Sequence, residues 1–278
     1  MSILRFTAKD HKYTTLDNHE EEWLSVTSLV SQFKKPFDSD GQSIKSSKKR
    51  GSKWYGMSPA EIKAAWKSEA FRATELGTWY HNQREKDLCG LETIIRDDRI
   101  LSIVKPIEIE GIKYSPDQKI GDGVYPEHLV YLRSAGICGQ SDLVEIVNGV
   151  VNITDYKTNK EIKTQGYTSW DGITQKMLPP LAHLDDCNLI HYALQLSVYM
   201  YIILKHNPKL KPGKLTLHHI IFEEQGKDKF DYPIAALDSN GEPIVQHVVP
   251  YEVPYLKSEV LAMINWLADN KHTLKPKH

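Results

Sequence analysis

The sequence predicts a mixed α/β domain in which helices flank a central mixed β-sheet. Residues 139–157 read as two short strands joined by Asn148-Gly149, a pair that suits the positive φ angles of a tight type I′ turn. A helical pattern runs from Ser58 to Gly90, and a second, strongly apolar one runs from Leu189 to Lys205. We expect these two helices to lie on opposite faces of the sheet.

The paired strands predict a cluster of charges at the end away from their turn. If Asn148 and Gly149 form the loop, Asp142 lies directly opposite Asp155, and Lys157 follows on the same face. Opposed carboxylates repel each other. A hard divalent cation between them would remove the repulsion, because Mg²⁺ takes oxygen ligands of this kind. Lys157 would place an ammonium beside the metal, and together these groups form a constellation for hydrolysing a phosphodiester. The alternative is a solvated hairpin end whose charges are incidental.

Four motifs in order give a family resemblance. They are Gly77 to His81, Tyr125 to Glu127, the G-x-x-D and D-x-K of residues 139–157, and Gln195-x-x-x-Tyr199. Together they resemble the RecB-like branch of the PD-(D/E)XK nuclease superfamily, which includes phage recombination exonucleases and the mitochondrial genome maintenance exonuclease. The resemblance covers residues 25–199. It implies a restriction-endonuclease-like core.

The resemblance also implies a set of metal ligands. Asp142 and Asp155, with the imidazole of His81 and the backbone carbonyl of Tyr156, would hold one or two Mg²⁺ or Mn²⁺ ions. Glu127 resembles an acidic residue that several relatives place beside the metals, and a plain surface acid is the alternative. Because imidazole is a softer ligand than carboxylate, Mn²⁺ is a candidate beside Mg²⁺.

Further roles follow from the same resemblance. Lys157 would orient the attacking water or stabilise the pentavalent phosphate, and Gln195 would support that lysine or the water. Tyr199 would contact a DNA phosphate. Glu85 follows His81 by four residues, so it lies on the same side of the helix as a supporting partner of the site or as a surface acid.

Composition restricts the remaining function classes. The 278 residues carry 35 basic and 36 acidic side chains, a net charge of −1, so any nucleic-acid surface must be a local patch. No apolar run is long enough to span a membrane. The N-terminus lacks the apolar core of a signal peptide, so we expect an intracellular, cytoplasmic protein that is not secreted. Three dispersed cysteines cannot supply the four ligands of the iron–sulfur cluster that some RecB-like nucleases carry, so we predict no cluster.

The N-terminal half predicts several elements ahead of the central strands. A hairpin of residues 5–13 and 14–23 precedes a short helix, capped by Ser25 or Thr27, that ends near Phe33. Residues 34–57 read as a flexible basic loop. Its candidate phosphate contacts are Lys48, Lys49 and Arg50, and a solvated loop or a nuclear localisation signal are the alternatives.

A helix begins at Ser58 with a capping box and a first-turn proline, with a break near residue 67. Along it Ala70, Ala73 and Gly77 form a stripe of small residues that would let another element approach closely. Residues 107–114 and 125–132 then read as strands. The stretch between residues 96 and 123 shows no chemistry.

After Lys157 a long segment without a periodic pattern extends to residue 188. It carries Lys160, Trp170 and Lys176, and exposed aromatic and basic side chains bind single-stranded DNA by stacking on bases and contacting phosphates. A packed connector is the alternative. The apolar helix that follows points Gln195 and Tyr199 the same way, since they are four residues apart.

The remainder, residues 210–278, predicts an elaboration of a single domain that spans the whole chain. Residues 215–222 read as a strand, residues 231–235 and 243–250 as a hairpin, and residues 253–270 as an amphipathic helix. His218 and His219 alternate faces on a strand, and we treat both as structural.

Together these expectations predict a hydrolase that cleaves DNA phosphodiesters with Mg²⁺ or Mn²⁺. We expect it to be an exonuclease that acts on single-stranded ends. Its role would lie in phage-type or viral-type DNA recombination, repair or genome processing. Its partner would be DNA, as single strands or duplex ends. A structure- or sequence-specific endonuclease is one alternative. A non-catalytic DNA-binding protein on a nuclease fold is another, but an intact Asp142, Asp155 and Lys157 argue against it.

Overall fold

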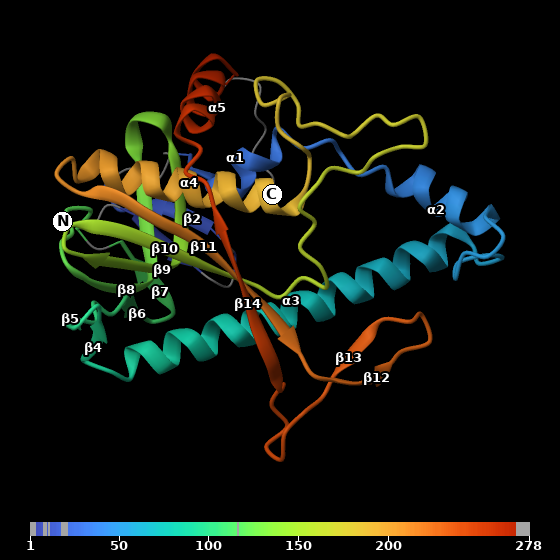
Figure 1. Cartoon of the computed structure of the whole chain (residues 1–278), viewed down its shortest axis with the longest axis horizontal. Helices are drawn as coiled ribbons and strands as arrows, with labels where there is room; N and C mark the ends of the chain where they lie inside the picture. Colours follow the sequence, from blue (N-terminus) through green and yellow to red (C-terminus); the bar gives the residue numbers. More distant parts are fainter. Residues whose placement is uncertain (1–3, 8–9, 11, 18–21, 116, 271–278) are drawn as a thin grey trace.

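The computed structural model describes residues 4–7, 10, 12–17, 22–115 and 117–270 (Figure 1). Its centre is a six-stranded sheet in the order β14-β11-β10-β9-β3, with β8 also paired to β9. Pairings of β10 with β11 and of β3 with β9 are parallel and the others antiparallel, so the predicted mixed sheet is confirmed. The strands are β3 Leu24–Ser25, β8 Gly123–Leu132, β9 Ile137–Val147, β10 Val150–Lys157, β11 Lys211–Phe222 and β14 Val245–Val253.

The hairpin of β9 and β10 forms in the predicted register. Asn148 and Gly149 have φ angles of 55° and 72°, as a type I′ turn requires. Val147 pairs with Val150, and the ladder continues to Leu143 opposite Thr154. One step further brings Asp142 level with Asp155.

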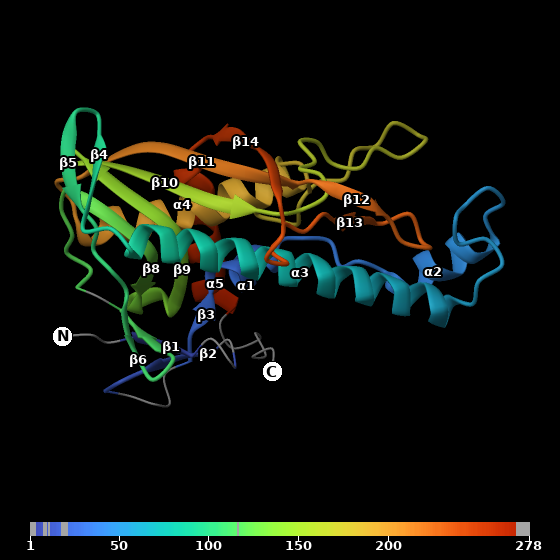
Figure 2. The ribbon, with the colours of Figure 1, turned by 90° about the horizontal axis from the view of Figure 1, so that it is seen from below.

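Two long helices cover the opposite faces of the sheet, as expected (Figures 1 and 2). On one face Val144, Ile146, Val151 and Ile153 pack in a core with α4 (Asn188–His206), and α1 (Val26–Ser31) and α5 (Lys257–Asn270) join it. The other face holds Leu143, Val147 and Val124 against Leu88 of α3 (Pro59–Cys89). The alternation of β9 and β10 therefore separates two cores.

Helix α3 begins where its sequence predicts. Ser58 and Glu61 form a capping box, and Pro59 is the first helical residue. The predicted break near residue 67 is absent, and the helix runs unbroken for 31 residues. At its other end lies a small hairpin of β4 (Thr93–Arg96) and β5 (Arg99–Ser102). This length lets one helix extend from the central sheet to the distant basic residues at the end of α2 (Ser39–Lys48).

A separate four-stranded sheet, in the order β2-β1-β7-β6, lies below the central one (Figure 2). Its strands are β1 Leu4–Thr7, β2 Lys12–Thr15, β6 Ile107–Ile109 and β7 Ile112–Tyr114. The single strand predicted for 107–114 is thus two, because Glu110 and Gly111 adopt positive φ angles of 52° and 75° and turn the chain. The predicted N-terminal hairpin forms with an earlier turn and shorter strands.

Ten residues of the predicted basic loop form a helix, α2 (Ser39–Lys48), so that prediction was wrong there. The Asp38 carboxylate caps it by accepting a hydrogen bond of 2.8 Å from the Gly41 N–H. Ser43 is buried. Serine-rich composition indicated a loop, and a cap with one buried small side chain was enough to make a helix.

The predicted hairpin of residues 231–235 with 243–250 was wrong in its strand pairing: the chain turns at residues 239–241, where Leu237 and Pro243 form an isolated antiparallel bridge, but the two strands pair elsewhere. Strand β13 (Pro233–Ala235) pairs with β12 (Glu224–Lys227), and β14 pairs with β11 from Leu215 to Phe222. The central sheet offers β14 a longer partner than β13 does. The terminal helix α5 accordingly starts at Lys257, after that strand. Between residues 158 and 187 only isolated bridges occur, as the aperiodic sequence predicts.

Within the described parts of the chain, no helix has both the length and the apolar character needed to cross a bilayer.

We predict that Ser58→Ala lowers the free energy of unfolding by about 1 kcal/mol, because it removes the hydroxyl that accepts a hydrogen bond from the Glu61 N–H and donates one to the Glu61 carboxylate at the start of α3. Urea unfolding followed by circular dichroism measures this. The matched control is Ser68→Ala, an exposed position inside the same helix, which should be neutral or slightly stabilising. Equal effects of the two substitutions would contradict the capping role.

Candidate active site

Three carboxylates form a row across neighbouring strands of the central sheet. Pro126 pairs with Leu143 and His128 with Ser141, which brackets Glu127 of β8 opposite Asp142 of β9. On its other side Asp142 is level with Asp155 of β10, one step beyond the last paired residues. The antiparallel register alone therefore brings the three acids together.

The sheet is interrupted at this row. Strand β10 pairs with β9 only along residues 143–147, and β3 pairs with residues 137–138, which leaves a gap beside Asp142. In that gap the Asp142 carboxylate accepts a hydrogen bond of 2.7 Å from the backbone N–H of Tyr156. Glu127 has a φ angle of 49°, so the β8 ladder is also broken there. Both departures from regular pairing fall at the row of carboxylates.

His81 of α3 completes a possible metal-binding group. Its Nδ1 lies 3.5 Å from Asp142 Oδ1 and 3.8 Å from Glu127 Oε1, and its Nε2 lies 3.2 Å from the carbonyl oxygen of Tyr156. One ligand atom from each of His81, Glu127 and Asp142 falls within 4.8 Å of the others. The helix comes this close because Gly77 has no side chain: a Cβ there would lie 3.1 Å from Thr158 Oγ1.

Asp155 and Lys157 of β10 form the other half of the site. The Lys157 Nζ lies 2.5 Å from Asp155 Oδ2, and Asp155 is 1% exposed. Gln195 of α4 donates a hydrogen bond of 3.2 Å to Asp155 Oδ1. The Oδ2 atom accepts no hydrogen bond of good geometry among the described residues, although the ammonium is near. This buried carboxylate oxygen therefore has the Lys157 ammonium as its counter-charge.

Burial and mutual charge shift the protonation of the cluster. Burial chiefly, and then repulsion by Asp155, raises the pKa of Asp142 to about 7. Burial by itself would lower the pKa of His81, but the negative charges of Asp142, Glu127 and Asp155 outweigh it and raise that pKa to about 9. In the same way burial opposes the charge of Lys157, and Asp155 and Asp142 overcome it to raise the lysine pKa.

The donor set fits a divalent metal ion. It offers carboxylate oxygens and a backbone carbonyl oxygen, which both Mg²⁺ and Mn²⁺ accept, and an imidazole nitrogen, a softer ligand. The raised pKa of Asp142 reflects burial beside a second carboxylate, that of Asp155. A bound cation would oppose this shift.

A family model for the PD-(D/E)XK nuclease superfamily matches residues 52–270. The chain belongs to the PD-(D/E)XK nuclease superfamily. The match includes each of the residues just described, from His81 to Gln195. Membership implies a nuclease, that is, a phosphodiester hydrolase acting on DNA, and metal-dependent activity is typical of these enzymes.

Comparisons with other proteins add little to the family model. A solved structure titled "Crystal structure of SSO0001" aligns with a TM-score of 0.34 and 16% identity over 94% of this chain and 80% of that chain. No function is carried over at this level of similarity. Among curated proteins no relative matches.

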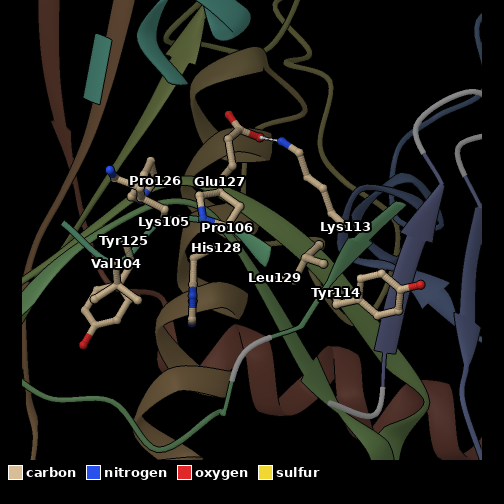
Figure 3. A pocket seen from close by; sticks show the side chains of 10 residues that line it. All are labelled: Val104, Lys105, Pro106, Lys113, Tyr114, Tyr125, Pro126, Glu127, His128 and Leu129. Carbon is tan, nitrogen blue, oxygen red and sulfur yellow. Dashed lines mark ion pairs between the residues drawn. The ribbon is translucent and has the colours of Figure 1, made fainter. Parts of the chain in front are cut away.

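Sequence reasoning missed one charged residue of this nuclease site, Lys113. It comes from β7 of the separate sheet, and its Nζ lies 2.7 Å from Glu85 Oε1 and 3.9 Å from Glu127 Oε2, as Figure 3 shows for Glu127. Glu85 therefore reaches the cluster only through this lysine. Burial raises the pKa of Glu85, and Lys113 opposes the shift. The sequence carries no motif that links residue 113 to the site.

Tyr199 lies in the interior of the protein. It is 3% exposed, and its hydroxyl accepts a hydrogen bond of 3.3 Å from the Gln195 amide. Burial raises the pKa of this tyrosine far above its usual value. The predicted phosphate contact would require this hydroxyl to be uncovered first. Tyr199 instead holds Gln195 in line with Asp155.

The predicted DNA-contacting side chains lie outside this cluster. Trp170 is 98% exposed in the 158–187 segment. Lys160 is exposed, and Lys176 is exposed but paired with Asp185 at 2.5 Å. The basic residues Lys48, Lys49 and Arg50 are exposed at the end of α2, beyond the N-terminal end of α3. His81 is 22 residues into that helix, about 33 Å along its axis.

We predict that Asp142→Asn stabilises the metal-free protein at pH 8. A carboxyl whose pKa is raised on folding binds more protons in the folded state, so stability falls as pH rises from about 4 to 7. The raised pKa of His81 acts in the same direction, since the stability it contributes below about pH 6.5 is lost as pH rises through 9. At roughly 1.4 kcal/mol per pKa unit, the substitution should add about 2–4 kcal/mol at pH 8 and less at pH 5.

Chemical unfolding in the presence of a chelator at both pH values measures this effect. The control is Asp269→Asn, an exposed acid on α5. If wild type and Asp142→Asn showed the same stability difference at pH 5 and pH 8, the carboxyl would titrate normally and its raised pKa would be refuted.

We also predict that Gly139→Ala disturbs the Tyr199–Gln195 pair. A Cβ on this β9 residue would lie 2.7 Å from Tyr199 Cε1, closer than packed atoms approach, and 3.2 Å from its hydroxyl. Overpacking of this kind costs about 1–3 kcal/mol of stability and should lower nuclease activity at least severalfold. Gly121→Ala is the matched control, since a Cβ there meets nothing within 4 Å. Thermal unfolding and activity of both variants decide the point, and equal behaviour would contradict it.

Proposed function

We propose that the protein is a Mg²⁺- or Mn²⁺-dependent exonuclease that favours single-stranded DNA ends. The observation that carries the catalytic part is the Lys157 ammonium, 2.5 Å from a buried Asp155 and next to the His81, Glu127 and Asp142 group. A decayed nuclease fold would have no reason to keep a costly buried charge cluster intact. The whole chain would act as one nuclease domain.

In this proposal each side chain has a distinct task. His81, Asp142, Asp155 and the Tyr156 carbonyl would hold the metal, with Glu127 beside them. When bound, the ion would activate water and neutralise charge that develops on the phosphate. The remaining work falls to the protein's own groups.

Lys157 would orient the attacking water or stabilise the pentavalent phosphate, because a compact ammonium can follow the charge as it forms. Its ammonium lies 4.8 Å from the ring centre of Tyr192, which limits where it can move. Gln195 would position Asp155 through their hydrogen bond. Cleavage is expected to leave 5′-phosphate and 3′-hydroxyl ends, as in the nucleases the chain resembles.

Preference for single strands is supported by the 158–187 segment that directly follows Lys157. Its Trp170 is almost fully exposed, and a base can stack on such a ring whatever its identity. A role in phage-type recombination, repair or genome processing rests on the family resemblance alone.

We predict that Lys157→Ala lowers kcat by at least 100-fold, the range found when one group that stabilises transition-state charge is removed. The assay uses end-labelled linear and circular DNA, single- and double-stranded, with Mg²⁺, Mn²⁺ or chelator. The control is Lys209→Ala, an exposed lysine beside the β9–β10 turn at the far end of the sheet. Metal-dependent loss of linear single strands supports the exonuclease, and the label shows its polarity.

Two outcomes of that assay would overturn the proposal. Internal cuts in circular DNA would identify an endonuclease on the same core. DNA binding without cleavage in either metal would leave a non-catalytic binding protein.

We predict that Trp170→Ala raises KM for single-stranded DNA about tenfold with little change in kcat, because one stacked base contributes roughly 1–3 kcal/mol. Steady-state kinetics on single-stranded oligonucleotides measure both constants. Ile100→Ala, which removes an apolar side chain that is 74% exposed on β5, is the control. An unchanged KM in Trp170→Ala would exclude this residue as a stacking platform.

A further inference from the structure

A groove of about 500 Å³ opens between α3 and the β12–β13 hairpin, beside the candidate active site. Its apolar walls come from Ala73, Leu76 and Trp79 of α3 and from Phe222, Ile234 and Leu237 opposite. The small residues predicted along α3 do not all face the same surroundings. Gly77 is met by Thr158, whereas Ala73 faces the open groove and is exposed.

Defined structural elements lie at both ends of the groove. At one end the hairpin tip packs on the start of α3: the rings of Phe230 and Trp54 lie 5.4 Å apart, and Arg72 pairs with Asp228 at 2.9 Å. At the other end its lining includes residues 158–160, which directly follow the catalytic lysine. A space enclosed in this way by aromatic packing and ion pairs is a preformed surface.

Charge around the groove disfavours nucleic acid. Five glutamates line it, Glu69, Glu75, Glu223, Glu224 and Glu242, against the two cations Arg72 and Lys160. Arg72 is already paired with Glu69 as well as Asp228. Within the described part of the chain, Glu75, Glu223 and Glu224 form no ion pair. A phosphate backbone would meet repulsion here, whereas a cationic partner would gain complementary contacts.

We propose that this groove docks a short basic segment of a protein partner, with apolar side chains against Ala73, Leu76 and Leu237 and lysine or arginine side chains toward the free glutamates. The ten-residue step from Glu69 to Trp79 on α3 spans about 15 Å. That length accommodates roughly four to five residues of extended chain. Such a partner would sit next to the active site without occupying it.

Two successive contacts connect the groove to Lys157. Asn159 lines the groove, and its side-chain oxygen accepts a hydrogen bond of 2.7 Å from the Tyr192 hydroxyl. The Tyr192 ring in turn lies beneath the Lys157 ammonium. A partner in the groove would therefore contact Asn159, which is connected to Lys157 through Tyr192.

The test measures binding in the presence of chelator, so it does not depend on nuclease activity. The probes are a fluorescein-labelled short peptide of alternating lysine and leucine, the matching glutamate and leucine peptide, and a labelled single-stranded oligonucleotide. Fluorescence anisotropy should show that the lysine peptide binds and that the glutamate peptide does not. Binding of both peptides with equal affinity would overturn the proposal.

Two variants locate the binding. The charge reversal Glu223→Lys with Glu224→Lys should raise the Kd of the lysine peptide at least tenfold, while Glu108→Lys with Asp269→Lys, exposed acids elsewhere, should not. Ala73→Trp fills the groove without changing its charge and should weaken peptide binding by a similar factor. Equal effects of the two charge reversals would indicate non-specific attraction and overturn the proposal. Loss of oligonucleotide binding in Ala73→Trp, with peptide binding intact, would make the groove a nucleic-acid channel instead.

Discussion

Repulsion among largely buried carboxylates is the constraint around which this structure is arranged. Glu127, Asp142 and Asp155 are brought into one row by strand register, and each is shielded from water that could screen the others. A sheet alone offers no remedy, because its backbone carries no net charge. Two cations come from other layers, His81 from α3 and Lys113 from the separate four-stranded sheet, and the third, Lys157, is the last residue of β10 itself.

That arrangement ties separate parts of the fold to one small volume. Helix α3 must lie close enough for His81 to reach Asp142, and Gly77 allows it. On the other face, α4 must place Gln195 against Asp155, and Gly139 leaves room for the Tyr199 ring that supports it. Even so, the compensation is incomplete, since the pKa of Asp142 stays raised. The residual imbalance is the physical basis for expecting a metal ion to stabilise the fold.

The sequence was most informative where local rules decide the geometry. Asn148-Gly149 fixed the turn, the turn fixed the register, and the register placed Asp142 beside Asp155. Contacts that depend on tertiary structure were out of reach. Lys113 enters the site from another sheet, and the choice of β11 over β13 as the partner of β14 depends on competition between distant strands. Tyr199 was placed in the right direction, but its burial depends on how closely α4 approaches β9.

Net charge conceals how the charges are distributed, and that distribution bears on function. A net charge of −1 does not show whether the protein has a surface that binds nucleic acid. In the structure the acids divide into a row that attracts a metal ion and a groove rim that would repel DNA. In the proposed function, a DNA strand at Lys157 would be repelled by the α3 groove and would favour the 158–187 segment, where Trp170 is exposed. Acidic residues beside a nuclease site can in this way direct the substrate as effectively as basic ones, by excluding it from one of two available paths.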